Sequence, residues 1–222
     1  CGNFETKLTQ QRAWDLHRFK RSQSCPCTTL SVSKDGEEVI TGGEDGRLNL
    51  VGLGDRDVKW TRGDGTGASI NRVQYRTGHE FFSVNGLGLL QLWDTRSHRK
   101  KSVLTMRNDL DEVDAAQYQL HDVCVHPNQP NTVTTGGGDG VLSVWDVRHP
   151  TFPITITKAH SAELWQIKFH PRHPDKLFTA SEDGQLLQWN TNVSQSSRKQ
   201  FAVPADGNNL SITALVDVDQ SC

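Results

Sequence analysis

The sequence has few of the features typical of membrane proteins or of disulfide-rich secreted domains. It has a single methionine, and its five cysteines are widely spaced and include no CxxC pair. An odd number of scattered cysteines favours reduced thiols. No apolar run approaches the roughly 18 residues of a membrane-spanning helix, and the polar first residues do not resemble a signal peptide. We therefore expect a soluble, intracellular protein with no membrane insertion.

Strong charge of either sign is also missing. The formal net charge is -2, and basic residues cluster only in two short patches, residues 17–21 and 96–101. A solvated loop is the simplest interpretation of each patch. We therefore expect no direct binding of nucleic acid.

Motifs for catalysis and for ligand binding are absent as well. The glycine-rich residues 136–140 lead into a strand-like segment, without the helix and lysine of a phosphate-binding loop. His170 and His173 flank a proline and lack further metal ligands at a suitable spacing, which favours a turn. No GxSxG elbow accompanies a positioned histidine. We predict no enzyme, no catalytic, cofactor-binding or metal site, and no small-molecule substrate.

What the sequence does contain is a repeat. Four segments align on a turn glycine, at intervals of 42, 52 and 44 residues: Gly46, Gly88, Gly140 and Gly184. Three of these glycines follow an aspartate, a dipeptide that favours the positive φ angles of a tight hairpin. Another short strand precedes each hairpin, and the variable segment after it could form an outer strand. An antiparallel four-stranded unit of about 40 to 45 residues is a propeller blade.

The repeat divides the chain into four complete blades with parts of two others. Residues 1–27 would hold a loop and the outer strand of a preceding blade, at residues 5–14. Residues 209–222 would hold the first strand of a following blade, at residues 211–218. We interpret residues 99–119, which contain about ten extra residues, as a charged surface loop suited to partner contacts. The predicted blades are residues 28–69, 70–118, 119–163 and 164–208.

The aligned residues resemble the WD40 repeat over roughly residues 28–203. In that family a histidine, a Ser or Thr, the turn Asp and a Trp form a hydrogen-bonded tetrad, which satisfies groups that are costly to bury unpaired. The resemblance implies an all-β propeller. It implies one complete tetrad, formed by His160, Thr179, Asp183 and Trp189. It implies partial tetrads from Thr135, Asp139 and Trp145, from Ser83 and Trp93, and from Thr41 and Asp45. The departures are Ala116 in place of His, Leu87 in place of Asp, and Val51 in place of Trp.

Three stretches, residues 38–50, 126–150 and 158–189, are similar to the small WD-repeat nucleoporins of the Y-shaped outer-ring complex. That resemblance implies a non-enzymatic scaffold that binds other nucleoporins of the Y complex. It further implies a place in the nuclear envelope at the nuclear pore, a role in mRNA and protein transport, and a kinetochore role in mitosis. Because these nucleoporins have seven blades, we predict that the chain is a fragment of a seven-bladed propeller.

The motif Trp-Asp-x-Arg supports an alternative. It occurs at residues 93–96 and 145–148, and it resembles the signature by which WD40 substrate receptors dock on the adaptor of cullin-4 ubiquitin ligases. In that interpretation Arg96 and Arg148 would contact the adaptor. The simpler interpretation is a blade end in which each arginine pairs with a nearby carboxylate.

We predict that the isolated 222-residue chain is poorly soluble or self-associates. Four blades do not close a ring, so both ends would present unpaired strands and apolar faces. Size-exclusion chromatography with light scattering checks this. A monodisperse monomer that melts cooperatively would contradict it.

Overall fold

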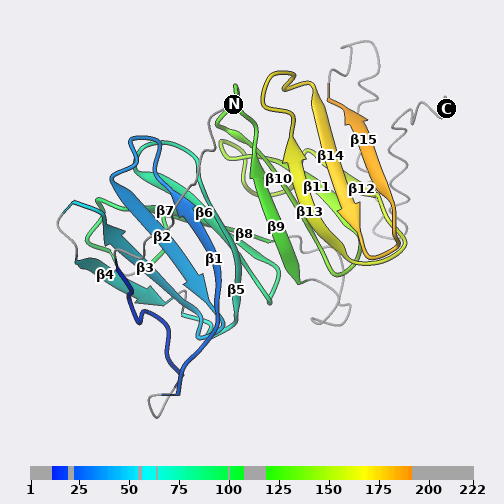
Figure 1. Ribbon diagram of the computed structural model, residues 1–222. Helices are drawn as coiled ribbons and strands as arrows, with labels where there is room; N and C mark the ends of the chain where they lie inside the picture. The colour runs from blue at the N-terminus through cyan, green and yellow to red at the C-terminus, as the bar shows by residue number, and fades with distance from the viewer. Residues whose placement is uncertain are drawn as a thin grey trace, which may run out of the picture.

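The computed structural model describes residues 12–19, 23–54, 57–63, 65–99, 101–107 and 119–191, and they form four antiparallel sheets (Figure 1). Blade 1 contains β1 (Cys27–Val32), β2 (Glu38–Gly43), β3 (Arg47–Gly52) and β4 (Val58–Gly63). Blade 2 contains β5 (Ile70–Tyr75), β6 (Glu80–Asn85), β7 (Leu89–Asp94) and β8 (Leu104–Arg107). Blade 3 contains β9 (Leu120–Val125), β10 (Thr132–Gly137), β11 (Val141–Asp146) and β12 (Thr155–Lys158). Blade 4 contains β13 (Leu164–Phe169), β14 (Lys176–Ser181) and β15 (Leu186–Asn190).

Within each sheet every strand pairs with its neighbour in sequence, which confirms the predicted all-β propeller architecture. The predicted loop at residues 99–119 is wrong in part, because Leu104–Arg107 pairs with β7 as the outer strand β8. Of the strand predicted at residues 5–14, only residues 12–14 are described, and they are not in a strand. The strand predicted at residues 211–218, and any fourth strand of blade 4 after residue 191, lie outside the described residues. The described part of the chain includes no helix that is long and apolar enough to span a bilayer.

The turn glycines have the backbone conformation that the hairpins require. The φ angles of Gly46, Gly88, Gly140 and Gly184 are 68, 74, 67 and 82°. At Gly140 a Cβ atom would also lie 2.4 Å from the carbonyl oxygen of Ala162, so a larger residue is excluded by contact as well as by conformation.

The inner strands β1, β5, β9 and β13 lie side by side, and side chains connect them to the backbone of the next blade. Thr29 accepts a hydrogen bond from the Val73 N–H at 3.1 Å. Asp122 accepts one from the Ile167 N–H at 2.7 Å, and its other oxygen lies 3.0 Å from Arg72 Nε. Burial raises the pKa of Asp122, although these donors oppose the effect. Backbone groups facing a neighbouring sheet are thereby satisfied where no strand ladder is possible.

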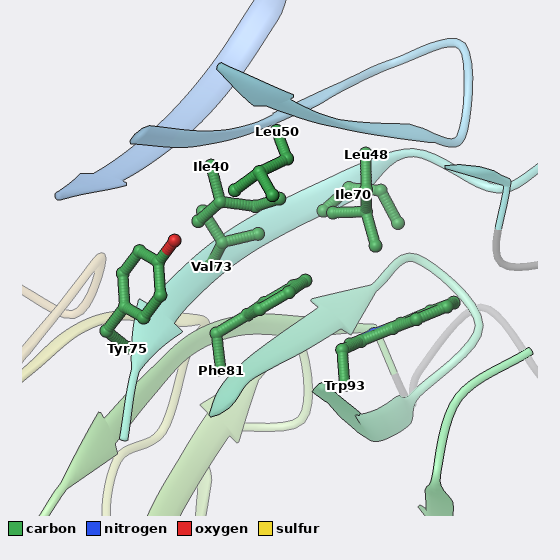
Figure 2. Packing of buried hydrophobic residues seen from close by; sticks show 8 residues of the cluster. All are labelled: Ile40, Leu48, Leu50, Ile70, Val73, Tyr75, Phe81 and Trp93. Atoms are coloured by element: carbon green, nitrogen blue, oxygen red, sulfur yellow. The ribbon is translucent and has the colours of Figure 1, made fainter. Parts of the chain in front are cut away.

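Between these connections the blades bury apolar clusters. Figure 2 shows the cluster between blades 1 and 2, in which side chains from β2 and β3 meet those of β5, β6 and β7. Phe81 is fully buried there, and the centre of its ring lies 6.2 Å from the ring centre of Trp93 and 6.0 Å from that of Tyr75. Similar clusters fill the interface between blades 2 and 3 and the interface between blades 3 and 4. Each blade therefore depends on its neighbours for most of its core.

Replacing Phe81 with alanine should lower the free energy of unfolding of the full-length gene product by about 3–5 kcal/mol, because the cavity would lie between two blades. Phe152→Ala is the matched control, since Phe152 is 63% exposed, and it should cost less than about 0.5 kcal/mol. Urea denaturation measures both. Equal effects would show that the interface between blades 1 and 2 adds little stability.

Candidate functional sites

The four residues of the predicted complete tetrad lie together in blade 4. His160 Nδ1 lies 3.0 Å from a carboxylate oxygen of Asp183, and its Nε2 lies 2.8 Å from Thr179 Oγ1. Trp189 Nε1 donates to the same hydroxyl oxygen at 2.9 Å. Since a carboxylate only accepts, the network assigns the imidazole proton to Nδ1, and Thr179 then donates to Nε2. Every polar hydrogen in this chain of bonds has an acceptor.

This arrangement suits a structural role better than a catalytic one. His160 is 3% exposed and Thr179 is fully buried, so no substrate can reach either. Burial tends to raise the pKa of Asp183, yet the N–H groups of Gln185 and Ser161 and the imidazole together lower it. The aspartate therefore stays ionised and fixes the turn to the preceding segment.

Blade 1 contains a second imidazole network that the sequence reasoning missed. His17 Nδ1 lies 2.9 Å from Asp45, and its Nε2 lies 3.0 Å from Thr41 Oγ1, the same bonds that His160 makes. His17 is 3% exposed, so the solvated loop expected for residues 17–21 is wrong at this position. His17 lies 28 residues before its turn aspartate, whereas His160 lies 23 residues before its own. Because the spacing differs, the sequence alignment did not match His17 with His160. A histidine placed before a Thr-x-x-x-Asp strand and turn was the available signal.

In this network an asparagine contacts the imidazole itself, whereas the tryptophan indole of the other blades donates to the Ser or Thr hydroxyl. Val51 pairs with Val39 at the register position that tryptophan has in the other blades, and it carries no polar hydrogen. Asn49, buried on the same strand, lies with Nδ2 3.3 Å from His17 Nε2 and donates to the Leu16 carbonyl at 3.2 Å. Its Oδ1 accepts from Thr61 at 2.6 Å.

Blades 2 and 3 contain the shorter forms of the network. Trp93 donates to Ser83 at 2.8 Å, and Trp145 donates to Thr135 at 2.9 Å. In blade 2, where Leu87 stands in place of aspartate, Asn85 Oδ1 accepts from the N–H groups of Leu87 and Leu89 at 3.0 Å. Asn85 thus caps the turn in place of an aspartate.

Asp139, the turn aspartate of blade 3, lies in a less complete environment. Its Oδ1 accepts from the Val141 N–H at 2.9 Å. Burial raises the pKa of Asp139, opposed by this bond and by Lys158. Asp139, Thr135 and Trp145 all line a cavity of about 20 Å³. Ala116, aligned with the tetrad histidine, lies outside the described residues.

The two arginines of the Trp-Asp-x-Arg motifs have matching surroundings at the ends of β7 and β11. Arg96 is held by both carboxylate oxygens of Asp94, at 3.1 and 3.0 Å, and Arg148 is held in the same way by Asp146. Their side chains remain 64% and 67% exposed. The bond from Arg148 lowers the pKa of Asp146 to about 2. Each arginine is therefore oriented by its own motif and partly neutralised by it.

The histidines near prolines act as turn caps. His170 Nδ1 accepts from the N–H groups of Arg172 and His173, at 3.1 and 3.0 Å, and His126 Nδ1 accepts from Asn128 and Gln129 in the same way. A nitrogen engaged in this way is not available to a metal ion. Nowhere in the described ranges do three His, Cys, Asp or Glu side chains gather as metal ligands.

Replacing Thr179 with valine should lower the free energy of unfolding of the full-length gene product by about 2–4 kcal/mol, because it leaves His160 Nε2 and the Trp189 indole without a partner. Thr135→Val is the matched control. It leaves only the indole of Trp145 without a hydrogen-bond partner, so we expect the free energy of unfolding to fall by about 1–2 kcal/mol. Chemical denaturation compares the two, and equal losses would mean that the histidine bond adds no stability.

Comparison with known proteins agrees with this geometry. The family "WD domain, G-beta repeat" matches residues 14–51, 114–146 and 151–190. Human Nucleoporin Nup43 is 39% identical over 148 residues, which cover 66% of this chain and 37% of the human protein. The Nuclear pore complex protein NUP43 of Arabidopsis thaliana is 31% identical over 135 residues, which cover 59% of this chain and 36% of that protein.

A solved structure shows the same fold. A chain in the crystal structure of the Mitotic Checkpoint Complex superimposes with a TM-score of 0.65 at 19% sequence identity, covering 76% of this chain and 48% of that one. The aligned segments span just over a third of the length of the human and plant nucleoporins. Together with the repeated sheets, turn glycines and hydrogen-bonded tryptophans, the matches show that the chain belongs to the WD40-repeat family.

Proposed function

We propose that the chain belongs to a non-enzymatic WD40 scaffold subunit of the nuclear pore complex. The observation that carries this proposal is the 39% identity to human Nucleoporin Nup43 over 148 residues, spanning two thirds of the chain. Its buried imidazoles are engaged in structural bonds, which agrees with a protein that binds rather than catalyses. A rigid propeller presents preformed loops, so little conformational entropy is lost on association.

The finer part of the proposal concerns location and partners. We infer that the protein lies at the nuclear envelope, within the Y-shaped outer-ring complex, and there serves transport of mRNA and protein. We further infer that it accompanies this complex to kinetochores in mitosis. The similarity to nuclear pore proteins of human, plant and amoeba supports the pore assignment.

The cullin-4 alternative has weaker support. Arg96 and Arg148 are exposed, as a docking residue must be, but each is already paired with the aspartate of its own motif. An adaptor would therefore have to compete with a charge-assisted bond or use the remaining guanidinium donors.

Tagging the endogenous protein should label the nuclear rim in interphase and kinetochores in mitosis, and it should co-purify nucleoporins of the Y complex. Arg148→Ala should leave this behaviour unchanged, since the pore proposal assigns no partner to that arginine. Diffuse staining with no nucleoporins recovered would overturn the proposal. Recovery of the cullin-4 adaptor, lost in Arg148→Ala, would favour the alternative.

A further inference from the structure

A groove lies at the rim where blade 1 meets blade 2, between β4 and the loop that joins β7 to β8. Its volume is about 560 Å³, within the roughly 300–1,000 Å³ of known ligand pockets. Among the side chains that line it are Lys59, Trp60, Arg62, His79, Arg96 and His98. The tetrads and the apolar clusters do not account for this collection of cations around an aromatic ring.

Arg62 is the central cation of the groove. Its guanidinium carbon lies 4.1 Å from the centre of the Trp60 ring, and the group donates to the carbonyl oxygens of Asp94 and Ser97. Within the part of the chain that the structure describes, these contacts are with a ring and with carbonyl groups, not with a carboxylate. Burial lowers the pKa of Arg62 against the opposing effect of Asp94. A carboxylate entering the groove would therefore offset a partly desolvated positive charge.

The rim of the groove is also predominantly basic. Lys59 bonds Glu38 at 2.7 Å and Arg96 bonds Asp94 at 3.0 Å, so each rim cation is oriented by an acidic partner. Of the described residues that line the groove, Glu38 is the single carboxylate, against three permanent cations and two histidines, and the Asp94 carboxylate pairs with one of these cations, Arg96. Charge complementarity therefore favours an anionic ligand.

The surrounding backbone favours a peptide in an extended conformation. Among the described strands β4 pairs with β3 alone, so its outer edge can accept a further strand. Nucleic acid fits less well, because bases bind such surfaces by stacking on aromatic faces. Trp60 already contacts Arg62 and stacks on Phe81, with ring centres 6.4 Å apart.

We propose that the groove between β4 and the β7–β8 loop binds an acidic segment of a partner protein, extended alongside β4. The segment places its carboxylates on Arg62 and on the rim cations Lys59 and Arg96. This inference does not depend on which complex the protein serves, so it can fail while the pore assignment stands.

To test it, peptides are selected from a random phage-displayed library on the full-length gene product, and the enriched sequences are synthesised with a fluorescein label. We expect enrichment of Asp- and Glu-rich peptides whose affinity, measured by fluorescence anisotropy, falls as salt rises. Arg96→Glu and Lys59→Glu should each weaken binding about tenfold or more, because an attraction becomes a repulsion.

Arg148→Glu is the matched control, since it changes the same motif with the same aspartate pairing in blade 3, away from the groove. It should bind the selected peptides as well as the unsubstituted protein does. Because both substituted arginines are exposed, folding should be preserved, and thermal melting verifies this. Failure to enrich acidic peptides, equal weakening by Arg96→Glu and Arg148→Glu, or binding of single-stranded RNA in place of peptide would each overturn the proposal.

Discussion

A buried imidazole that must satisfy both of its nitrogens fixes the geometry of blades 1 and 4. In blade 4 the bonds run from Trp189 through Thr179 and His160 to Asp183, and they join a strand, the incoming segment and a turn. Because each group is costly to bury without a partner, the turn can occupy only one position relative to the strands. In these two blades the hydrogen-bonded network therefore also sets the positions of the loops that follow the turn.

The sequence predicted this framework where one residue type has one physical use. Glycine at the hairpin turns is such a case, since positive φ and close backbone contact at Gly140 leave no substitute. His17 was missed because a histidine in such a segment has several possible uses. Three of the four residues that follow it are basic, so the segment resembles a solvated loop, and only the folded chain brings it against Thr41 and Asp45.

Substitution of one chemical group by another accounts for the remaining differences. Asn49 provides hydrogen-bond donors where Val51 cannot, and Asn85 caps a turn where Leu87 cannot. In both cases an amide on a nearby residue supplies polar groups that the side chain at the aligned position lacks. An alignment by column cannot detect such compensation, because the two residues differ in both type and position. The sequence did not reveal the groove beside Trp60 either, since it forms between strands of blade 1 and loops of blade 2.

The side chains that connect the inner strands differ from one boundary between blades to the next. The hydroxyls of Thr29 and Ser31 join blades 1 and 2, and the amides of Asn71 and Gln74 join blades 2 and 3. The Asp122 carboxylate bonds both Arg72 of blade 2 and the Ile167 N–H of blade 4. Blades that look interchangeable by their hairpins are therefore not interchangeable at their edges. A chain with two blades exchanged would keep every repeat, yet these side chains would face backbone groups other than the ones they bond here.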